Sequence, residues 1–174
     1  VKAPLATLVR ALHALKLGEH KTARDLMAEE TGGVGKMMSP PLSAWSLVGE
    51  GDLAGALAAL EPLKGNAAMV LFYDLHAGVI EELNGHPDKA EAHYLTLKKN
   101  TGTTVRAVEL LGGLYERTGA TEKALAVYRE FAAISGEGQV MLDAAQKRIQ
   151  DAKPLQLAID TPKKGAAEAL FGPA

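Results

Sequence analysis

The stretch Gly112–Phe131, "GGLYERTGATEKALAVYREF", decides the fold because its pattern occurs twice in the chain. Four of its residues have a counterpart of the same type 34 positions earlier: Gly112, Gly119, Ala124 and Tyr128 match Gly78, Gly85, Ala90 and Tyr94. Four identities at one offset indicate a repeated unit, and a period of about 34 residues is typical of paired helices that stack in arrays. The sequence therefore predicts an all-α chain built from helical hairpins.

Each repeat is predicted to fold as two helices joined by a short turn. Apolar residues recur at helical spacing along 105–115 and again along 121–134. Gly119 and Gly85 lie where the first helix of each repeat ends, and a glycine in the left-handed conformation ends a helix at little cost. Pro87 then suits the first turn of a second helix. We therefore expect a tight turn at both glycines.

Small residues inside the helices predict close packing. Gly112 and Gly78 fall in the middle of a first helix, where a glycine costs about 1 kcal/mol relative to alanine. We expect a neighbouring helix to approach these glycines closely, with Ala124 and Ala90 as the matching small surface. The tyrosine that follows each alanine by four positions is expected to fill the interface with the next unit.

The repeat frame extends towards the N-terminus with fewer identities. Gly51 and Ala56 keep the turn glycine and the small contact residue, while Gly18 and Ala23 suggest an earlier unit shifted by one residue. Residues 155–174 break the period and are predicted to be an irregular connection followed by the start of a further helix. The predicted repeat array, residues 1–154, comprises hairpins at about 4–31, 39–65, 71–100 and 105–135 and a helix at 139–152.

Composition restricts the classes of partner. The chain has 174 residues, 47% of them hydrophobic, which is enough to bury a core without a metal or a disulfide. Its 19 basic and 21 acidic residues are interspersed, so the chain has no general attraction for nucleic acid or anionic lipid. No apolar run reaches the roughly 18 residues of a membrane span. We therefore expect no nucleic-acid partner and no direct membrane insertion.

No catalytic residue, metal site or cofactor is predicted. The segment Thr31–Lys36, "TGGVGK", resembles a phosphate-binding loop, but Glu30 stands where that motif needs its first glycine and Met37 where it needs serine or threonine. His86 and His93 lack the surrounding carboxylates of a metal site, and the absence of cysteine removes thiolate ligands and nucleophiles. The sequence therefore favours a protein that is not an enzyme.

Six residues of the fourth hairpin carry a family resemblance: Leu111, Gly112, Tyr115, Gly119, Ala124 and Tyr128. On these positions the chain resembles the tetratricopeptide repeat (TPR) family, most clearly over Leu71–Ser135. The resemblance implies stacked helix-turn-helix repeats that form a right-handed α-solenoid with a concave binding face. Val108, where the family often has tryptophan, and Gly136, where it often has proline, depart from its pattern. The structural repeat positions would be Gly78, Gly85, Ala90, Tyr94, Gly112, Tyr115, Gly119, Ala124 and Tyr128.

The chain as a whole also looks like part of larger repeat proteins of alphaproteobacteria, many of which are exported. The start at Val1 indicates either a removed leader or a piece of a longer protein, and the abrupt end in "EALFGPA" favours a fragment of such a larger protein. This resemblance favours the periplasm or cell envelope over the cytoplasm.

In the TPR family partners usually bind against the first helices of the hairpins. Applied to this chain, that register predicts four apolar anchors followed by a polar edge. The predicted partner-binding residues are Trp45, Phe72, Leu75, Val79, Arg106 and Glu109. An apolar groove of this kind suits the nonpolar face of a partner helix or an extended segment. We therefore expect a non-enzymatic interaction scaffold that binds a protein or peptide.

Two alternatives share the same pattern. Large exposed apolar patches are uncommon on soluble monomers, so a second copy, a flanking segment or the 155–174 tail could cover the groove, which would make the chain a self-association module or homo-oligomer. The apolar residues could equally form the core between hairpins, with the inward register displaced by one position.

Overall fold

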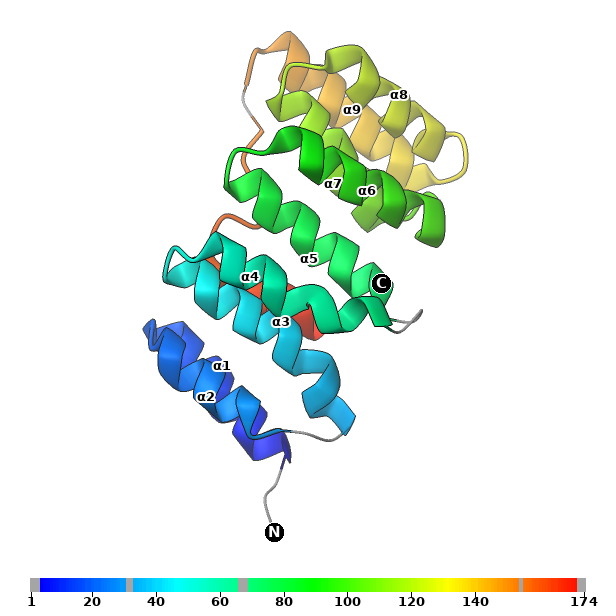
Figure 1. The fold of residues 1–174 in the computed structure, drawn as a ribbon. Coiled ribbons are helices and arrows are strands. Elements are labelled where there is room, and N and C mark those ends of the chain that lie inside the picture. The colour runs from blue at the N-terminus through cyan, green and yellow to red at the C-terminus, as the bar shows by residue number, and fades with distance from the viewer. Residues whose placement is uncertain (1–3, 31–32, 66–68, 154, 172–174) are drawn as a thin grey trace. The chain divides into compact units, whose positions relative to one another are not determined.

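The protein is all-helical in its described residues, 4–30, 33–65, 69–153 and 155–171, which contain ten α-helices and one short 3₁₀ helix in this computed structural model (Figure 1). Helices that follow one another in sequence pack as antiparallel pairs. This arrangement confirms the predicted all-α class and is consistent with a helical repeat.

The helices have the following bounds. The first four pairs are α1 (Pro4–Leu17) with α2 (His20–Ala28), α3 (Gly33–Gly49) with α4 (Leu53–Leu60), α5 (Val70–Leu83) with α6 (Pro87–Thr101), and α7 (Val105–Arg117) with α8 (Thr121–Ala132). The remaining elements are the 3₁₀ helix η1 (Glu61–Gly65), α9 (Gly136–Gln150) and α10 (Pro162–Phe171).

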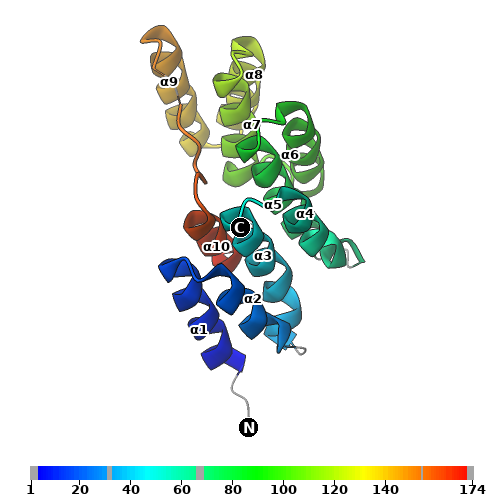
Figure 2. The same cartoon turned by 60° about the vertical axis from the view of Figure 1, so that its left-hand side comes forward.

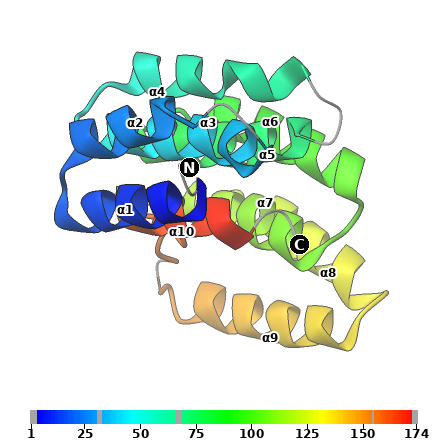
Figure 3. The same ribbon diagram turned by 90° about the horizontal axis from the view of Figure 1, so that it is seen from below.

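The chain divides into two compact units. Unit 1 comprises Val1–Ile80 and Ile159–Pro173, and unit 2 comprises Glu81–Ala158. In unit 1, α2 packs between α1 and α3, and α3 packs on α4, while α10 lies alongside α3 and α1 (Figures 2 and 3). In unit 2, α6, α7, α8 and α9 pack in sequential order. The far C-terminal helix therefore belongs to the same unit as the first helices of the chain.

The helix α3 begins earlier than the sequence predicts. Its prolines at 40 and 41 favour a helix start near residue 39, yet α3 already begins at Gly33 and continues through both prolines. A proline inside a helix has no N–H for the carbonyl four residues earlier, so this helix lacks two internal hydrogen bonds. At the same place the Ser39 hydroxyl donates to the Met27 carbonyl at 3.2 Å, which ties α3 to the end of α2.

The turn glycines behave as the repeat predicts. Gly18, Gly51, Gly85 and Gly119 all adopt left-handed backbone conformations, with φ between 75° and 81°. After each one, the next residue donates its N–H to a carbonyl five positions back, as in Ala120 to Tyr115 at 2.8 Å. A β-carbon disfavours this conformation, so glycine is the residue that ends each first helix at the lowest cost.

A fifth turn of the same kind follows α9, and its left-handed residue is an alanine. Ala152 has φ 51°, and Lys153 donates its N–H to the Arg148 carbonyl at 2.9 Å. The helix α9 therefore ends as the first helix of a hairpin does. No second helix follows directly, because residues 155–161 take no regular structure before α10 begins.

Gly112 lies against a side chain of the second helix. A β-carbon at Gly112 would lie 2.6–2.9 Å from two ring carbons and the hydroxyl oxygen of Tyr128, so the glycine makes room for the tyrosine side chain. Tyr128 therefore fills a gap inside its own hairpin, and it also borders α9, whose Arg148 shares the Glu116 carboxylate with the Tyr128 hydroxyl. The physical reason is size: only a residue without a side chain on α7 leaves space for an aromatic ring on α8.

The two turns at Gly119 and Ala152 generate a paired prediction. Gly119→Ala should lower the free energy of unfolding by about 1 kcal/mol, because a β-carbon is strained at positive φ. Ala152→Gly should raise the free energy of unfolding by up to about 1 kcal/mol, because the same strain is released. Equilibrium urea denaturation of both variants measures the two shifts. Equal shifts of the same sign would contradict the assignment of Ala152 as a repeat turn.

Candidate functional site

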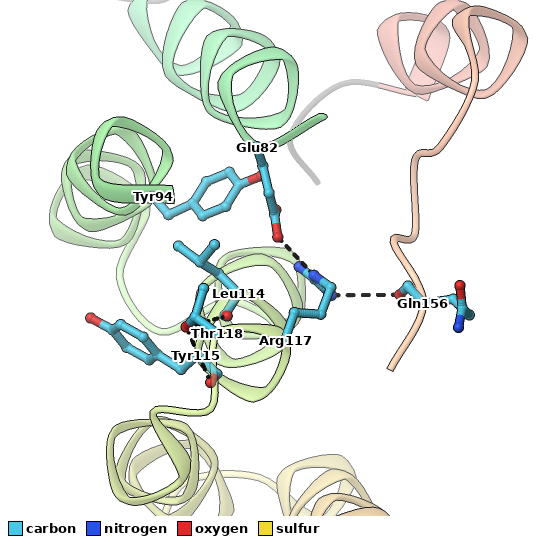
Figure 4. A network of polar contacts seen from close by, with 7 residues as sticks. All are labelled: Glu82, Tyr94, Leu114, Tyr115, Arg117, Thr118 and Gln156. Atoms are coloured by element: carbon cyan, nitrogen blue, oxygen red, sulfur yellow. Dashed lines mark hydrogen bonds and ion pairs between the residues drawn. The ribbon is translucent and has the colours of Figure 1, made fainter. Parts of the chain in front are cut away.

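A partly enclosed carboxylate joins two successive hairpins in unit 2. Glu82, in the last turn of α5, accepts a hydrogen bond from the Tyr94 hydroxyl at 3.0 Å and another from Arg117 Nε at 2.7 Å (Figure 4). Its side chain is only 8% exposed. Tyr94 lies on the second helix of the same hairpin and Arg117 on the first helix of the next one. One carboxylate therefore fixes three helices.

The same link recurs one repeat later. Glu116 accepts from the Tyr128 hydroxyl at 2.7 Å and from Arg148 Nη2 at 2.8 Å and Nε at 3.0 Å. Its side chain is 4% exposed, and Arg148 comes from α9. A bidentate arginine–carboxylate pair fixes orientation as well as distance. We call each of these arrangements a Tyr–Glu–Arg link.

The second hairpin replaces this link with apolar residues. Val48 and Leu60 stand 34 positions before Glu82 and Tyr94, and Leu60 is fully buried. Both polar partners are absent together, so no buried carboxylate is left unpaired. Replacing both members of a buried polar pair is tolerated far better than replacing one.

The links perturb the titration of their tyrosines. Burial, with the neighbouring Glu82 carboxylate, raises the pKa of Tyr94 well above its ordinary value of 10. Burial and Glu116 likewise raise the pKa of Tyr128 above 10. The hydrogen bond with Glu116 raises the pKa of Arg148. All three shifts favour the state in which a neutral hydroxyl and a charged guanidinium meet one carboxylate.

A second set of ion pairs joins the second helices α6 and α8. Glu91 accepts from the Tyr115 hydroxyl at 2.6 Å and from Lys123 Nζ at 3.0 Å, and these two hydrogen bonds lower the pKa of Glu91. Lys98 Nζ donates to Glu130 at 2.6 Å and 2.7 Å, and lowers the pKa of that carboxyl. Each pair has one exposed and one half-buried member, so solvent screens the attraction and each pair contributes only modestly to stability.

A pocket of about 360 Å³ opens in unit 2 between α7, α9 and the segment 155–158. It brings together the two predicted polar residues, since Arg106 Nη1 and Glu109 Oε2 form an ion pair at 3.1 Å on its wall. Arg117 and Arg148 of the two links also line it, together with apolar side chains that include Val140 and Met141. The pocket therefore offers guanidinium groups beside an apolar wall.

The chain itself lies along one side of this pocket. Leu155 lies over Gly113 of α7, where a β-carbon would be 3.3 Å from Leu155 Cδ2. Arg117 Nη1 makes a long hydrogen bond of 3.5 Å to the Gln156 carbonyl (Figure 4). A chain segment without regular structure therefore rests on a first helix, held by one side chain and one main-chain contact.

The predicted apolar anchors lie in unit 1, apart from the polar pair in unit 2. Trp45, Leu75 and Val79 are almost completely buried, and Phe72 is partly exposed. Trp45 Nε1 donates to His76 Nδ1 at 3.1 Å. An aspartate at position 75 or 79 would bury a charge and destabilise the fold, so these two positions cannot report on partner binding alone.

A helix of the same unit covers Trp45. A β-carbon on Gly165 of α10 would lie 2.0 Å from two atoms of the indole ring, so the α10 backbone rests directly on the tryptophan. The face of α3 that carries Trp45 is therefore covered by α10.

Sequence reasoning missed the two carboxylates of the links, although a signal was present. Glu82 and Glu116 are separated by 34 residues, the same offset as Tyr94 and Tyr128. Arg148 lies outside the strict period, which explains why the complete link could not be assembled from offsets alone.

The residues considered for metal or phosphate binding take part in the helices and their hydrogen bonds. His86 precedes α6, and its Nδ1 lies 2.6 Å from Glu81 Oε2. Gly33 and the residues after it in "TGGVGK" are the first turn of α3, while Thr31 and Gly32 lie outside the described residues. Within the described parts of the chain, no group of three or more histidine or acidic residues is placed to hold a metal ion.

The helices of the described segments include none that is both long and apolar enough to cross a membrane. The sequence matches no protein-family model and no curated protein.

The tyrosines of the links generate a pH prediction. In the unfolded chain they ionise near their ordinary pKa of 10, whereas the folded state keeps them protonated. The unfolded state then binds fewer protons, so the free energy of unfolding should fall as the pH rises above 10. An alkaline titration that records tyrosinate absorbance and helical circular dichroism in one sample should show both changes together.

Tyr128→Phe is the control for this titration. It removes a hydrogen bond to a charged group and should lower the free energy of unfolding at neutral pH by about 1.5 kcal/mol. It should also weaken the dependence of stability on alkaline pH. Tyrosinate formation near pH 10 for all tyrosines with the helices intact would contradict the enclosed character of the links.

Proposed function

We propose that the chain is a TPR-like, non-enzymatic interaction scaffold that binds a segment of a partner protein on the first helices of its hairpins. The observation that carries this proposal is the open pocket on α7 and α9, which contains Arg106 and Glu109 at its edge and an exposed apolar wall. Right-handed solenoid stacking of the hairpins is part of the same proposal, supported by the sequential pairs and the recurrent turns.

The lining of the pocket favours a partner segment of mixed chemistry. Arg106, Arg117 and Arg148 provide positive charge, and Glu109 is the single acidic residue among the lining side chains. Val140, 70% exposed, presents an apolar surface beside them. A partner segment with an apolar side chain next to a carboxylate matches both features.

The segment at 155–158 supports an extended mode of binding. It lies against Gly113 and Arg117 without regular secondary structure, which is how an extended partner peptide would rest on the same helix. In this mode of binding, side chains of the scaffold contact the main chain of the partner peptide. Pockets that accept the side chains of the peptide give the specificity.

The apolar anchors contribute to partner binding only in a state in which α10 has left Trp45. Trp45, Leu75 and Val79 are buried, and Trp45 lies under α10. Their predicted role as anchors therefore requires α10 to leave, whereas the pocket in unit 2 is open as it stands.

The alternative function is self-association. The docking of α10 beside α3 and α1 favours it, because a helix that a chain can dock on itself can also be exchanged between two copies. A homo-oligomer formed in this way would use the same contacts and would leave the pocket on α7 and α9 unchanged.

A matched pair of substitutions tests the proposed partner site. Val140 and Ile134 are 70% and 68% exposed, both lie in unit 2, and only Val140 lines the pocket. Affinity capture from an extract of the source cell, with mass spectrometry, should recover a partner with the wild-type chain and the Ile134→Glu variant. The Val140→Glu variant should bind the recovered partner at least tenfold more weakly, because a carboxylate replaces the apolar wall.

Both variants keep the buried core, so helical circular dichroism should be unchanged. Equal loss of binding in both variants would place the partner elsewhere on unit 2. Equal retention would remove the pocket from the proposal, and a concentration-dependent mass without any captured partner would favour self-association.

A further inference from the structure

The helix α10 docks on two first helices of unit 1 through its smallest residues. Gly165, Ala166 and Ala169 are its buried residues, and Gly165 lies directly on the Trp45 ring. Its large apolar side chains are less buried: Phe171 is 82% exposed, and Leu170 is 44% exposed and borders a pocket beside α1. The α10 side of the contact therefore contributes little apolar area, and the large buried side chain is Trp45 of α3.

The second helix of a hairpin buries larger side chains. The buried residues of α8 are Ala124, Leu125, Val127, Tyr128 and Phe131. The helix α10 therefore contributes fewer large apolar side chains to its contact than α8 contributes to its hairpin.

The fit of α10 is also incomplete on the side of α1. A pocket of about 200 Å³ remains between the two helices, and its exposed surface is almost entirely apolar. Its lining residues are Leu12, Leu15, Lys16, Lys163, Ala166, Ala167 and Leu170. The groove between α1 and α3 is therefore wider than the helix that occupies it.

The tail that contains α10 rests on first helices in both units. In unit 2 its residues 155 and 156 contact α7, and in unit 1 its helix contacts α3 and α1. These are the helices on which the proposed function places the partner. Of the predicted partner residues, Trp45 therefore lies directly under the tail.

We propose that α10 is a built-in competitor: it occupies a helix-binding groove between α1 and α3, and a partner helix binds there by displacing it. The partner helix presents a glycine to Trp45, because no β-carbon fits there. One turn away it presents an apolar side chain larger than alanine, which fills the space that α10 leaves beside Leu12 and Leu15. This inference rests on the proposed scaffold function.

Two substitutions on α10 move the competition in opposite directions. Gly165→Ala places a β-carbon inside the Trp45 ring and should expel α10 from the groove. Ala167→Leu places a larger apolar side chain into the pocket beside α1 and should hold α10 more tightly. Both residues belong to the tail, so neither change alters α1 or α3.

The probe is a fluorescently labelled peptide of residues 159–171, titrated into the full-length chain and followed by anisotropy. The peptide should bind the Gly165→Ala chain at least tenfold more tightly than the wild-type chain, and the Ala167→Leu chain more weakly than both. A peptide carrying Gly165→Leu is the matched control and should bind none of them. Acrylamide quenching of Trp45, the single tryptophan, should rise in the Gly165→Ala chain and fall again when the wild-type peptide is added.

Three results would overturn the proposal. Equal affinity of the peptide for all three chains would show that the groove does not exchange its occupant. Loss of cooperative unfolding in the Gly165→Ala chain would make α10 a permanent part of the core. A doubled mass in that chain, without peptide binding, would assign the groove to the α10 of a second copy.

This experiment is separable from the test of the pocket in unit 2. It needs no partner protein, because the probe is the tail of the chain itself. If the peptide binds in the stated order while Val140→Glu has no effect on a captured partner, the exchangeable groove stands and the pocket assignment fails. If the peptide binds all three chains equally while Val140→Glu weakens binding of a captured partner, the pocket assignment stands and the exchangeable groove fails.

Discussion

The stacking of unit 2 depends on carboxylates that cannot be left unpaired. Glu82 and Glu116 are almost enclosed, and removing an ion from water is costly unless hydrogen bonds replace the lost solvation. Each one takes a hydroxyl from its own hairpin and a guanidinium from the next first helix. The spacing between hairpins is thereby fixed by arginine–carboxylate hydrogen bonds, one at Glu82 and two at Glu116, and not by apolar contact alone. Where Val48 and Leu60 replace the pair, packing has to supply the same constraint.

The proposed binding chemistry follows from this structural requirement. Arg117 and Arg148 are placed to satisfy the two carboxylates, and the same guanidinium groups line the pocket on α7 and α9. A structural ion pair holds each long side chain in one orientation, so little side-chain entropy remains to be lost when a partner binds. A scaffold of this type would obtain preorganised cations from the interactions that stack its repeats.

Local features of the fold could be predicted from the sequence, whereas contacts between distant segments could not. The turn glycines and the hairpin pairing depend on backbone conformation and periodicity, which a single sequence displays. The closeness of Tyr128 to Gly112 could not be predicted, because helical spacing brings both Ala124 and Tyr128 near this glycine and only packing decides how close each one comes. Arg106 and Glu109 were placed on one surface by register alone. The contact between Trp45 and Gly165 has no periodic signal, since it joins segments 120 residues apart.

The tail contains two residues whose local energetics are unfavourable. Ala152 repeats the turn that precedes a second helix, but at positive φ an alanine is less favourable than the glycine of the other four turns. The segment that follows continues to α10, where Gly165 lies inside a helix and lowers its intrinsic stability by about 1 kcal/mol. Helix propensity therefore argues against a glycine at this position, while contact with the Trp45 ring requires one. Gly165 is therefore explained by its contact with Trp45 and not by the stability of α10 as an isolated helix.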